Sequence, residues 1–278
     1  MPELPQADTA AHSLQADAAP SSLQAEAANE EPLLRLRGVH LSVGPYRILH
    51  GVDLDIPAGQ VTMLLGRNGA GKTSTLRTIM GLWRASEGAI TLAGRRIDTL
   101  DTPAIAQAGL AYVPESMGIF ADLTVAENLV LAARRARGVD DLDAARLARI
   151  LDFFPALKTF WHQAAGLLSG GQKQMLAVAR AMIEPRTLLL IDEPSKGLAP
   201  AIVANLTAAL RQLKAEGATV LLVEQNVAMA RALGDRVAVM DDGRIVHHGP
   251  MAELAADTAL QQRLLGLSLG GTHGVPAR

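Results

Sequence analysis

The chain contains no cysteine among its 278 residues. Disulfide bonds, thiolate catalysis and cysteine-ligated metals are therefore excluded. The sequence also lacks any apolar run close to the roughly 18 residues that a membrane-spanning helix requires. Any role at a membrane is therefore expected to depend on a partner.

A surplus of charge of one sign is also missing. There are 26 Lys and Arg against 28 Asp and Glu, which gives a formal net charge of −2. This balance offers no basic excess that would indicate nucleic acid, so we expect no nucleic-acid partner. Apolar residues make up 49% of the sequence, enough to bury a sizeable core.

Lys and Arg are absent from residues 1–31, which are rich in Ala, Gln, Ser and Pro and carry six acidic side chains. We expect residues 1–32 to form a disordered acidic tail. The acidic start argues against a secretory or organellar address. A folded domain is predicted over residues 33–268, followed by a flexible tail over 269–278.

The strongest motif is a glycine-rich loop that follows an apolar strand, Val61–Leu65, and opens a helix predicted from Ser74 to Gly81. Strand, glycine-rich loop and helix, in this order, form a phosphate-binding loop. Its backbone N–H groups point at the anion, Lys72 can reach the β- and γ-phosphates, and the Thr73 hydroxyl can bind Mg²⁺. The residues assigned to nucleotide binding are Gly66, Arg67, Asn68, Gly69, Ala70, Gly71, Lys72, Thr73 and Ser74.

In the rest of the sequence, the spacing of apolar residues predicts strands interleaved with helices. Strands are predicted near residues 34–39, 52–56, 88–92, 110–113, 187–191 and 219–223, with a hairpin over 236–247. Residues 115–168 are predicted to be a helical insertion into this α/β core. Its first helix would begin at a capping box, Thr124 with Glu127, and run to Arg137, and its second would run from Asp141 to Phe154.

Two acidic residues follow the buried strand that ends at Ile191. We expect Asp192 to hold Mg²⁺ beside the phosphate loop. Glu193 is predicted to point to the other side of the strand, where it can polarise a water for in-line attack on the γ-phosphate. The alternative is that these acids merely end the strand, and the upstream phosphate loop makes that alternative weaker.

A third motif opens the helix predicted from Lys173 to Met182. It consists of Leu168 followed by Ser169, Gly170, Gly171 and Gln172. Ser is an N-cap residue and the glycines expose backbone N–H groups, so this is a second anion-binding helix start. The alternative is an ordinary capped helix. Two such starts suggest that one serves a second nucleotide, or the nucleotide of another subunit.

The segments Gly66–Thr73, Leu168–Gln172 and Leu188–Glu193 together resemble the ATPase subunit of ABC transporters, whose signature motif is LSGGQ. The resemblance covers roughly residues 33–265. It implies an α/β fold, with a P-loop NTPase core, an antiparallel β subdomain and an inserted helical subdomain. It also implies ATP and Mg²⁺ as cofactors.

In this family two ATPases dimerise head to tail, with ATP between the phosphate loop of one subunit and the LSGGQ motif of the other. The resemblance implies that Ser169 and Gly171 contact the γ-phosphate held by the partner. Closure on ATP and reopening after hydrolysis would drive the attached permeases. The helical insertion and the loop at Glu115 would dock on those permeases.

The sequence departs from the usual family pattern at several positions. Glu115, assigned here to the metal site with Thr73 and Asp192, stands where Gln is usual, and Gln225 stands at the switch position where His is usual. The stretch Gly197–Pro200 lacks the usual Asp. No aromatic residue lies where one usually stacks on adenine; Tyr46 is the candidate substitute, and the alternative is an ordinary loop tyrosine.

The departures are similar to one subgroup, the second ATPase of branched-chain amino acid importers (the LivF type). The similarity rests on Pro114-Glu115, Gly197–Pro200 and Glu224-Gln225-Asn226. Gln225 can hydrogen-bond the γ-phosphate or water but cannot titrate, so a proton relay through it is not expected. Glu193 and Gln225 are the candidate catalytic residues. A degenerate site, kept only for structure, is disfavoured because Lys72 and both acids are present.

The expected partners are permease subunits, a second ATPase that is a different chain or another copy, and indirectly a solute-binding protein. The expected location is peripheral, on the cytoplasmic face of the inner membrane. A soluble ABC-type ATPase acting on nucleic acid or ribosomes is disfavoured, because such proteins usually carry two cassettes or long coiled-coil insertions. An exporter ATPase, a urea or amide importer, and a weak regulatory partner remain alternatives.

Overall fold

The structure is a computed structural model that describes residues 31–266. The chain divides into two units, Met1–Glu31 and Pro32–Arg278, and the fold below is that of the second unit. The tails predicted over residues 1–32 and 269–278 lie outside the described residues, apart from Glu31 and Pro32. Among the helices that the structure describes, none has the length and hydropathy to span a bilayer.

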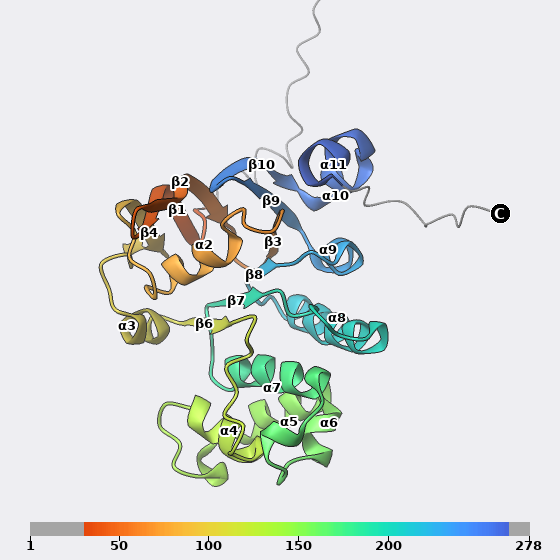
Figure 1. The fold of residues 1–278 in the computed structure, drawn as a ribbon. Helices are drawn as coiled ribbons and strands as arrows, with labels where there is room; N and C mark the ends of the chain where they lie inside the picture. Colours follow the sequence, from red (N-terminus) through yellow and green to blue (C-terminus); the bar gives the residue numbers. More distant parts are fainter. Residues whose placement is uncertain (1–30, 267–278) are drawn as a thin grey trace, which may run out of the picture. The chain divides into compact units, whose positions relative to one another are not determined.

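A six-stranded sheet, ordered β10-β9-β3-β8-β7-β6, forms the centre of this unit (Figure 1). Five of its strands run parallel, and β10 is antiparallel to β9. The strands are β3 (Val61–Gly66), β6 (Leu110–Val113), β7 (Leu188–Asp192), β8 (Val220–Val223), β9 (Arg236–Asp241) and β10 (Arg244–Pro250). Parallel strands place their carboxyl ends along one edge, where the polar residues that follow them meet.

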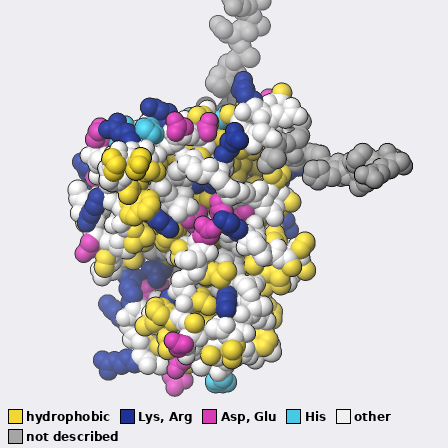
Figure 2. Space-filling model, viewed as in Figure 1, with side chains coloured by type: hydrophobic (Ala, Val, Ile, Leu, Met, Phe, Trp, Pro, Cys, Tyr) yellow, Lys and Arg dark blue, Asp and Glu magenta, His cyan; other side chains and the backbone are white. Residues whose placement is uncertain are grey.

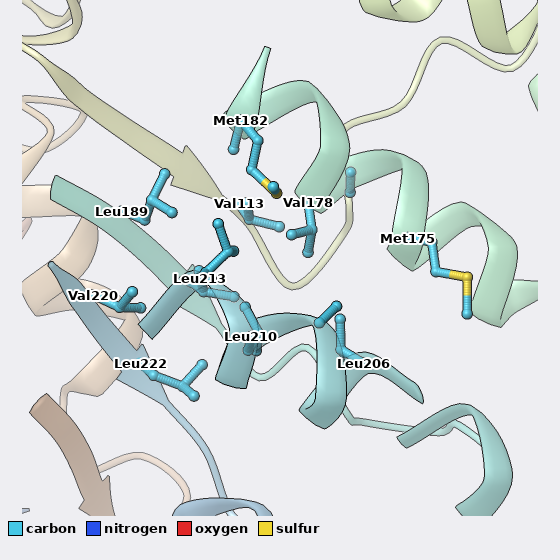
Figure 3. Packing of buried hydrophobic residues seen from close by; sticks show 14 of the residues in the cluster. Val113, Met175, Val178, Met182, Leu189, Leu206, Leu210, Leu213, Val220 and Leu222 are labelled. Atoms are coloured by element: carbon cyan, nitrogen blue, oxygen red, sulfur yellow. The ribbon is translucent and has the colours of Figure 1, made fainter. Parts of the chain in front are cut away.

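Both faces of the sheet are buried, which explains why its central strands are almost wholly apolar. Along β7, Leu189 and Ile191 enter one hydrophobic cluster, while Leu188 and Leu190 enter the other. In the first cluster, side chains of β6, β7 and β8 meet those of two helices, α7 (Gly170–Met182) and α8 (Pro200–Ala215), as Figure 3 shows.

The second cluster lies between the central sheet and a four-stranded antiparallel sheet, ordered β2-β1-β4-β5. Its strands are β1 (Leu34–Val43), β2 (Tyr46–Ile56), β4 (Glu87–Leu92) and β5 (Arg95–Arg96). The same cluster takes side chains from α2 (Lys72–Ile79) and α3 (Thr102–Gln107). The predicted antiparallel β subdomain therefore covers one face of the P-loop core.

Three helices form the predicted helical insertion, and they lie with α7 below the central sheet in Figure 1. They are α4 (Val125–Ala132), α5 (Ala144–Phe153) and α6 (Pro155–Thr159), with short 3₁₀ turns at Val139–Asp141 and Ala165–Leu167. The predicted Thr124–Glu127 capping box is present, with Thr124 N donating to Glu127 Oε2 at 2.7 Å.

The predicted length of the first insertion helix is wrong. It ends at Ala132 rather than Arg137, so Arg134, Arg135 and Arg137 do not lie on a helix. A distant residue ends it, because Glu184 accepts hydrogen bonds from both the backbone N (2.6 Å) and Nε (2.7 Å) of Arg134. The second helix starts at Ala144 rather than near Asp141, with Asp143 as its N-cap.

The chain ends its described part with α9 (Val227–Leu233), α10 (Met251–Ala256) and α11 (Thr258–Leu265). These helices pack on the first hydrophobic cluster through residues such as Met229, Leu233 and Leu254. On the face that Figure 2 shows, acidic and basic side chains are interspersed and do not separate into fields of one sign.

Candidate nucleotide site

The phosphate loop connects β3 directly to α2, as the sequence predicts. Gly66 has φ 147°, and a Cβ there would lie 2.2 Å from the carbonyl oxygen of Met240 on the neighbouring strand. Gly71, the N-cap of α2, has φ 106°. Both positions need glycine, since a side chain would either clash with the sheet or strain the backbone.

The start of α2 is left open to a ligand. No side chain caps it, so its first N–H groups are not occupied by the chain's own cap. Lys72, only 5% exposed, folds back over the loop and its Nζ donates to the carbonyl oxygens of Gly66 (2.9 Å) and Arg67 (3.0 Å). Burial lowers the pKa of Lys72, and the charges of Glu193 and Asp192 partly oppose that shift.

Asp192 is fully buried at the end of β7 and faces the start of α2. The Thr73 hydroxyl donates to its Oδ1 at 3.1 Å, and the Tyr112 hydroxyl donates to its Oδ2 at 3.3 Å. Burial raises the pKa of Asp192, while these two hydrogen bonds act in the opposite direction. Burial, with a contribution from the Asp192 charge, also raises the pKa of Tyr112 to about 12.

The predicted orientation of Glu193 is wrong in an informative way. In a regular strand, consecutive side chains alternate sides, but Glu193 has φ 46°, a left-handed conformation that ends the alternation. Its carboxylate therefore also lies at the phosphate loop, with Oε1 3.9 Å from Lys72 Nζ. Its Oε2 lies 3.6 Å from Lys196 Nζ.

Gln225 follows β8 and bridges two parts of the site. Its Nε2 donates to Glu193 Oε1 at 2.6 Å and to Asn68 Oδ1, in the phosphate loop, at 2.7 Å. The predicted catalytic residues Glu193 and Gln225 are thus in direct contact. A neutral amide can orient a carboxylate and a water here but cannot accept a proton at neutral pH.

Glu115 and Tyr46 lie further from this centre. Glu115 is half-exposed, and its Oε1 pairs with Lys196 Nζ at 2.5 Å. Its negative charge contributes to the raised pKa of Asp192, so it is electrostatically part of the site. Tyr46 is 72% exposed at the start of β2, where it pairs with Val43. The metal-binding role of Glu115 and the stacking role of Tyr46 remain predictions.

The second predicted anion site begins α7 in the helical region. Ser169 and Gln172 form a capping box, in which Ser169 N donates to Gln172 Oε1 at 2.8 Å. Ser169 and Gly170 are exposed, whereas Gly171 is buried against α8, where an added Cβ would lie 2.5 Å from Ile202 Cγ2. Within residues 31–266, no hydrogen bond or ion pair joins this start to the phosphate loop of the same chain.

Sequence reasoning assigned no role to three polar residues that shape the site: Tyr112, Ser195 and Glu224. Glu224 is 2% exposed and accepts hydrogen bonds from Ser195. The signal for it was available, because Glu224 directly follows the apolar run Val220–Val223, as Asp192 follows the apolar run of residues 188–191. Tyr112 and Ser195 carried no such signal, since their contacts join segments far apart in the sequence.

This geometry has counterparts among known proteins. Residues 49–196 match the family described as ABC transporter. The chain is 40% identical over 223 residues to the high-affinity branched-chain amino acid transport ATP-binding protein BraG of Pseudomonas aeruginosa, covering 80% of this chain and 95% of that protein. It is 36% identical over 239 residues to a probable branched-chain amino acid transport ATP-binding protein, LivF, of Archaeoglobus fulgidus, covering 84% and 99%.

A solved structure, the ADP conformation of an ATP-binding cassette of an ABC transporter, aligns with a TM-score of 0.73 at 25% identity. The alignment covers 84% of this chain and 96% of that structure. It therefore includes the P-loop core, the antiparallel sheet and the helical region together. The chain belongs to the ABC transporter family, as an ATP-binding subunit that hydrolyses ATP.

Proposed function

We propose that this chain is the ATPase of an importer for branched-chain amino acids, with Glu193 as the general base of ATP hydrolysis. The observation that supports the solute class is the similarity to two relatives named for this transport, over 95% and 99% of their lengths. The subgroup residues Glu115, Gln225 and Gly197–Pro200 lead to the same class.

The phosphates of ATP would occupy the loop between β3 and α2. The loop presents backbone N–H groups at a helix start without a side-chain cap, and Lys72 lies in reach with its charge buried. The carbonyl oxygens that now hold Lys72 Nζ would be exchanged for phosphate oxygens. Because burial disfavours the Lys72 charge, an anion that pairs with it is bound more strongly than at a solvated lysine.

Magnesium fits the pair formed by Thr73 and Asp192. A hydroxyl and a buried carboxylate lie 3.1 Å apart there, and oxygen donors of this kind are the ligands that Mg²⁺ prefers. When bound with ATP, the metal would neutralise charge on the β- and γ-phosphates. A positive ion would also offset the burial that raises the pKa of Asp192.

Hydrolysis needs a water aligned with the γ-phosphate. Glu193 would accept a proton from this water as its oxygen forms a bond to phosphorus and the bond to the ADP oxygen breaks. Gln225 would orient the water and the carboxylate, since its amide already contacts Glu193 Oε1 at 2.6 Å. Lys72 would stabilise the negative charge on the phosphoryl group.

A second ATPase subunit would complete the site. Ser169–Gln172 present a helix start at an exposed surface, without contacts to the phosphate loop of their own chain. We propose that this start faces the γ-phosphate held by a partner ATPase, which the subgroup implies is a different chain. Permease subunits and a solute-binding protein would complete the importer, with this chain on the cytoplasmic face of the membrane.

The docking surface for a permease would be a groove of about 520 Å³ between the core and the helical region. Its lining includes Leu82, Tyr112, Pro114 and Met117, with contributions from α4 and α7. Tyr112 has its hydroxyl on Asp192, so a segment seated in the groove would touch the same side chain that contacts the proposed metal ligand. This continuity favours a permease segment as the occupant.

The first experiment is to purify the tagged full-length chain from detergent-solubilised native membranes and identify what accompanies it by mass spectrometry. Two permeases and a second ATPase are expected. Uptake of radiolabelled leucine by cells that lack the chain should return with the wild type and fail with Glu193→Gln. Copurification of ribosomal or DNA-repair proteins without any membrane protein, or normal leucine uptake without the chain, would overturn the importer assignment.

A further inference from the structure

Glu224 is a buried carboxylate that the proposed chemistry does not use. It directly follows β8, whose last residue, Val223, lies level with Asp192 at the end of β7. One of these neighbouring strands therefore ends in an acid and the other is followed directly by one, but only Asp192 is hydrogen-bonded to Thr73. Glu224 is 2% exposed, and no cation lies within ion-pair distance of it among residues 31–266.

The carboxylate of Glu224 is instead occupied by four hydrogen bonds. Ser195 N donates to Oε1 at 2.8 Å, and Ser195 Oγ donates to Oε2 at 2.8 Å. The backbone N–H groups of Gln225 and Asn226 both donate to Oε2 at 3.0 Å. An ionised carboxylate only accepts hydrogen bonds, so it matches a site made of four donors.

These bonds join the two segments that carry the proposed catalytic pair. Ser195 lies two residues after Glu193, and Gln225 is itself held through its backbone. The Gln225 side chain then contacts Glu193 Oε1 at 2.6 Å, which closes a ring through Ser195 and Glu224. The position of one segment is thus tied to that of the other.

We propose that Glu224 is a positioning residue for ATP hydrolysis, which fastens the turn after Glu193 to the backbone of Gln225 and so sets the geometry of the Glu193–Gln225 pair. The inference rests on the proposed roles of these two residues. Glu193 has a left-handed backbone that an L residue rarely adopts, and such a conformation persists only where its surroundings hold it. The hydrogen bonds between Ser195 and Glu224 help to stabilise this backbone conformation.

The test variant is Glu224→Gln in the full-length chain. A glutamine of the same shape must present its NH₂ group to at least one of the four donors, whichever way the amide is turned. The turn would then shift. We expect kcat for ATP hydrolysis to fall by about 10- to 100-fold, because small displacements of catalytic groups slow a reaction by this much. The affinity for ATP should stay within about twofold, because the hydrogen bonds of Glu224 go to Ser195, Gln225 and Asn226 rather than to the phosphate loop.

A double-mutant cycle distinguishes the proposed positioning role of Glu224 from a role in stability alone. In a Gln225→Ala background, Glu224→Gln should cost about threefold or less, because the Gln225 side chain that Glu224 positions against Glu193 is gone. Gln261→Ala is the matched control: it removes another buried polar side chain, whose Nε2 donates to Leu254 O and Ala255 O. It should lower the melting temperature and leave kcat unchanged.

Folded Glu224→Gln with wild-type kcat, or fully additive losses in the cycle, would overturn the inference. If Glu224→Gln does not fold, Ser195→Ala replaces it; a kcat lower by about threefold at unchanged ATP affinity supports the proposal, and a wild-type kcat overturns it. Glu193→Gln, measured in parallel, separates a failure of the proposed catalytic role of Glu193 from a failure of the positioning role of Glu224. Normal turnover in that variant overturns the proposed catalytic role itself, whereas an inactive Glu193→Gln beside a normal Glu224→Gln overturns only the positioning.

Discussion

The two glycine-containing helix starts of this chain, at α2 and at α7, look alike in sequence but are finished differently. At α2, Gly71 provides no side-chain cap, and buried charges surround the open N–H groups. At α7, Ser169 and Gln172 cap the helix reciprocally, and the adjacent Gly171 packs against Ile202. One start is prepared for a ligand and the other is already satisfied by its own chain.

The two helix starts therefore contribute differently to the stability of the fold. An open helix start with a buried lysine and a buried aspartate is costly until an anion and a cation arrive. A capped start is stable by itself and can meet a ligand only from outside. We therefore expect substitutions of the charged side chains at the α2 side to alter chemistry and spare the fold, and substitutions at the α7 side to affect the fold first.

The largest effect is expected for Glu193→Gln. Loss of a general base should lower steady-state ATP hydrolysis by about 1,000-fold, while the neutral isostere keeps the space and leaves ATP binding intact. Phosphate release and binding of a fluorescent ATP analogue measure the two properties. Glu253→Gln, at an exposed glutamate of α10, is the control and should behave as wild type. Normal turnover in Glu193→Gln would assign the base elsewhere.

Asp192→Asn should lower hydrolysis by about 100-fold through loss of the proposed metal ligand. Without nucleotide, however, it should raise the melting temperature by about 2 to 4 °C at pH 7. Burial raises the pKa of Asp192, so its charged form destabilises the fold above that pKa. The gain should shrink as the pH falls through the folded-state pKa, because the wild-type carboxyl then becomes neutral too. A lower melting temperature at pH 7 would contradict this account.

At the α7 side, Gly171→Ala should destabilise the fold by about 1 to 3 kcal/mol, since its Cβ would lie 2.5 Å from Ile202 Cγ2. Gly170→Ala is the matched control, because the nearest atom to a Cβ there, Leu198 Cδ2, is 4.0 Å away. Urea denaturation measures both. Adding Ile202→Ala should recover part of the loss in Gly171→Ala, and equal stability of the two single variants would show that packing does not select this glycine.

The smallest effect is expected for Ser169→Ala, about 1 kcal/mol from the lost cap. Thr124→Ala removes the corresponding cap of α4 and should cost a similar amount. Only Ser169→Ala is expected to lower ATP hydrolysis in the assembled transporter as well, because Ser169 is proposed to face the partner's nucleotide. Equal hydrolysis by both variants would remove Ser169 from the proposed interface.

The elements that create the site were predictable because their signals are local. The phosphate loop, the buried strand before Asp192 and the cap at Ser169 each depend on residues adjacent in sequence. The continuous apolar runs at residues 188–191 and 220–223 also predicted buried strands. What the sequence predicts well is therefore the position of each donor and acceptor along the chain.

The errors arose where distant segments decide the local conformation. The early end of α4 depends on Glu184, which takes the N–H of Arg134 that a longer helix would use. The left-handed turn at Glu193 departs from the alternation of a regular strand, and it places two consecutive acids in one site. Such a turn depends on bonds to the end of β8, which no pattern near residue 193 reveals.

The strand before the phosphate loop, β3, pairs with two strands that lie far downstream in the sequence, β8 and β9. Val61 pairs with Val220 on one side, and Gly66 pairs with Met240 on the other. Contacts of such high sequence separation form slowly and leave unpaired strand edges exposed until they do. During translation, β3 therefore cannot pair until β8 and β9 have been synthesised, so a nascent chain acquires its ATP site only after residue 241 has been added.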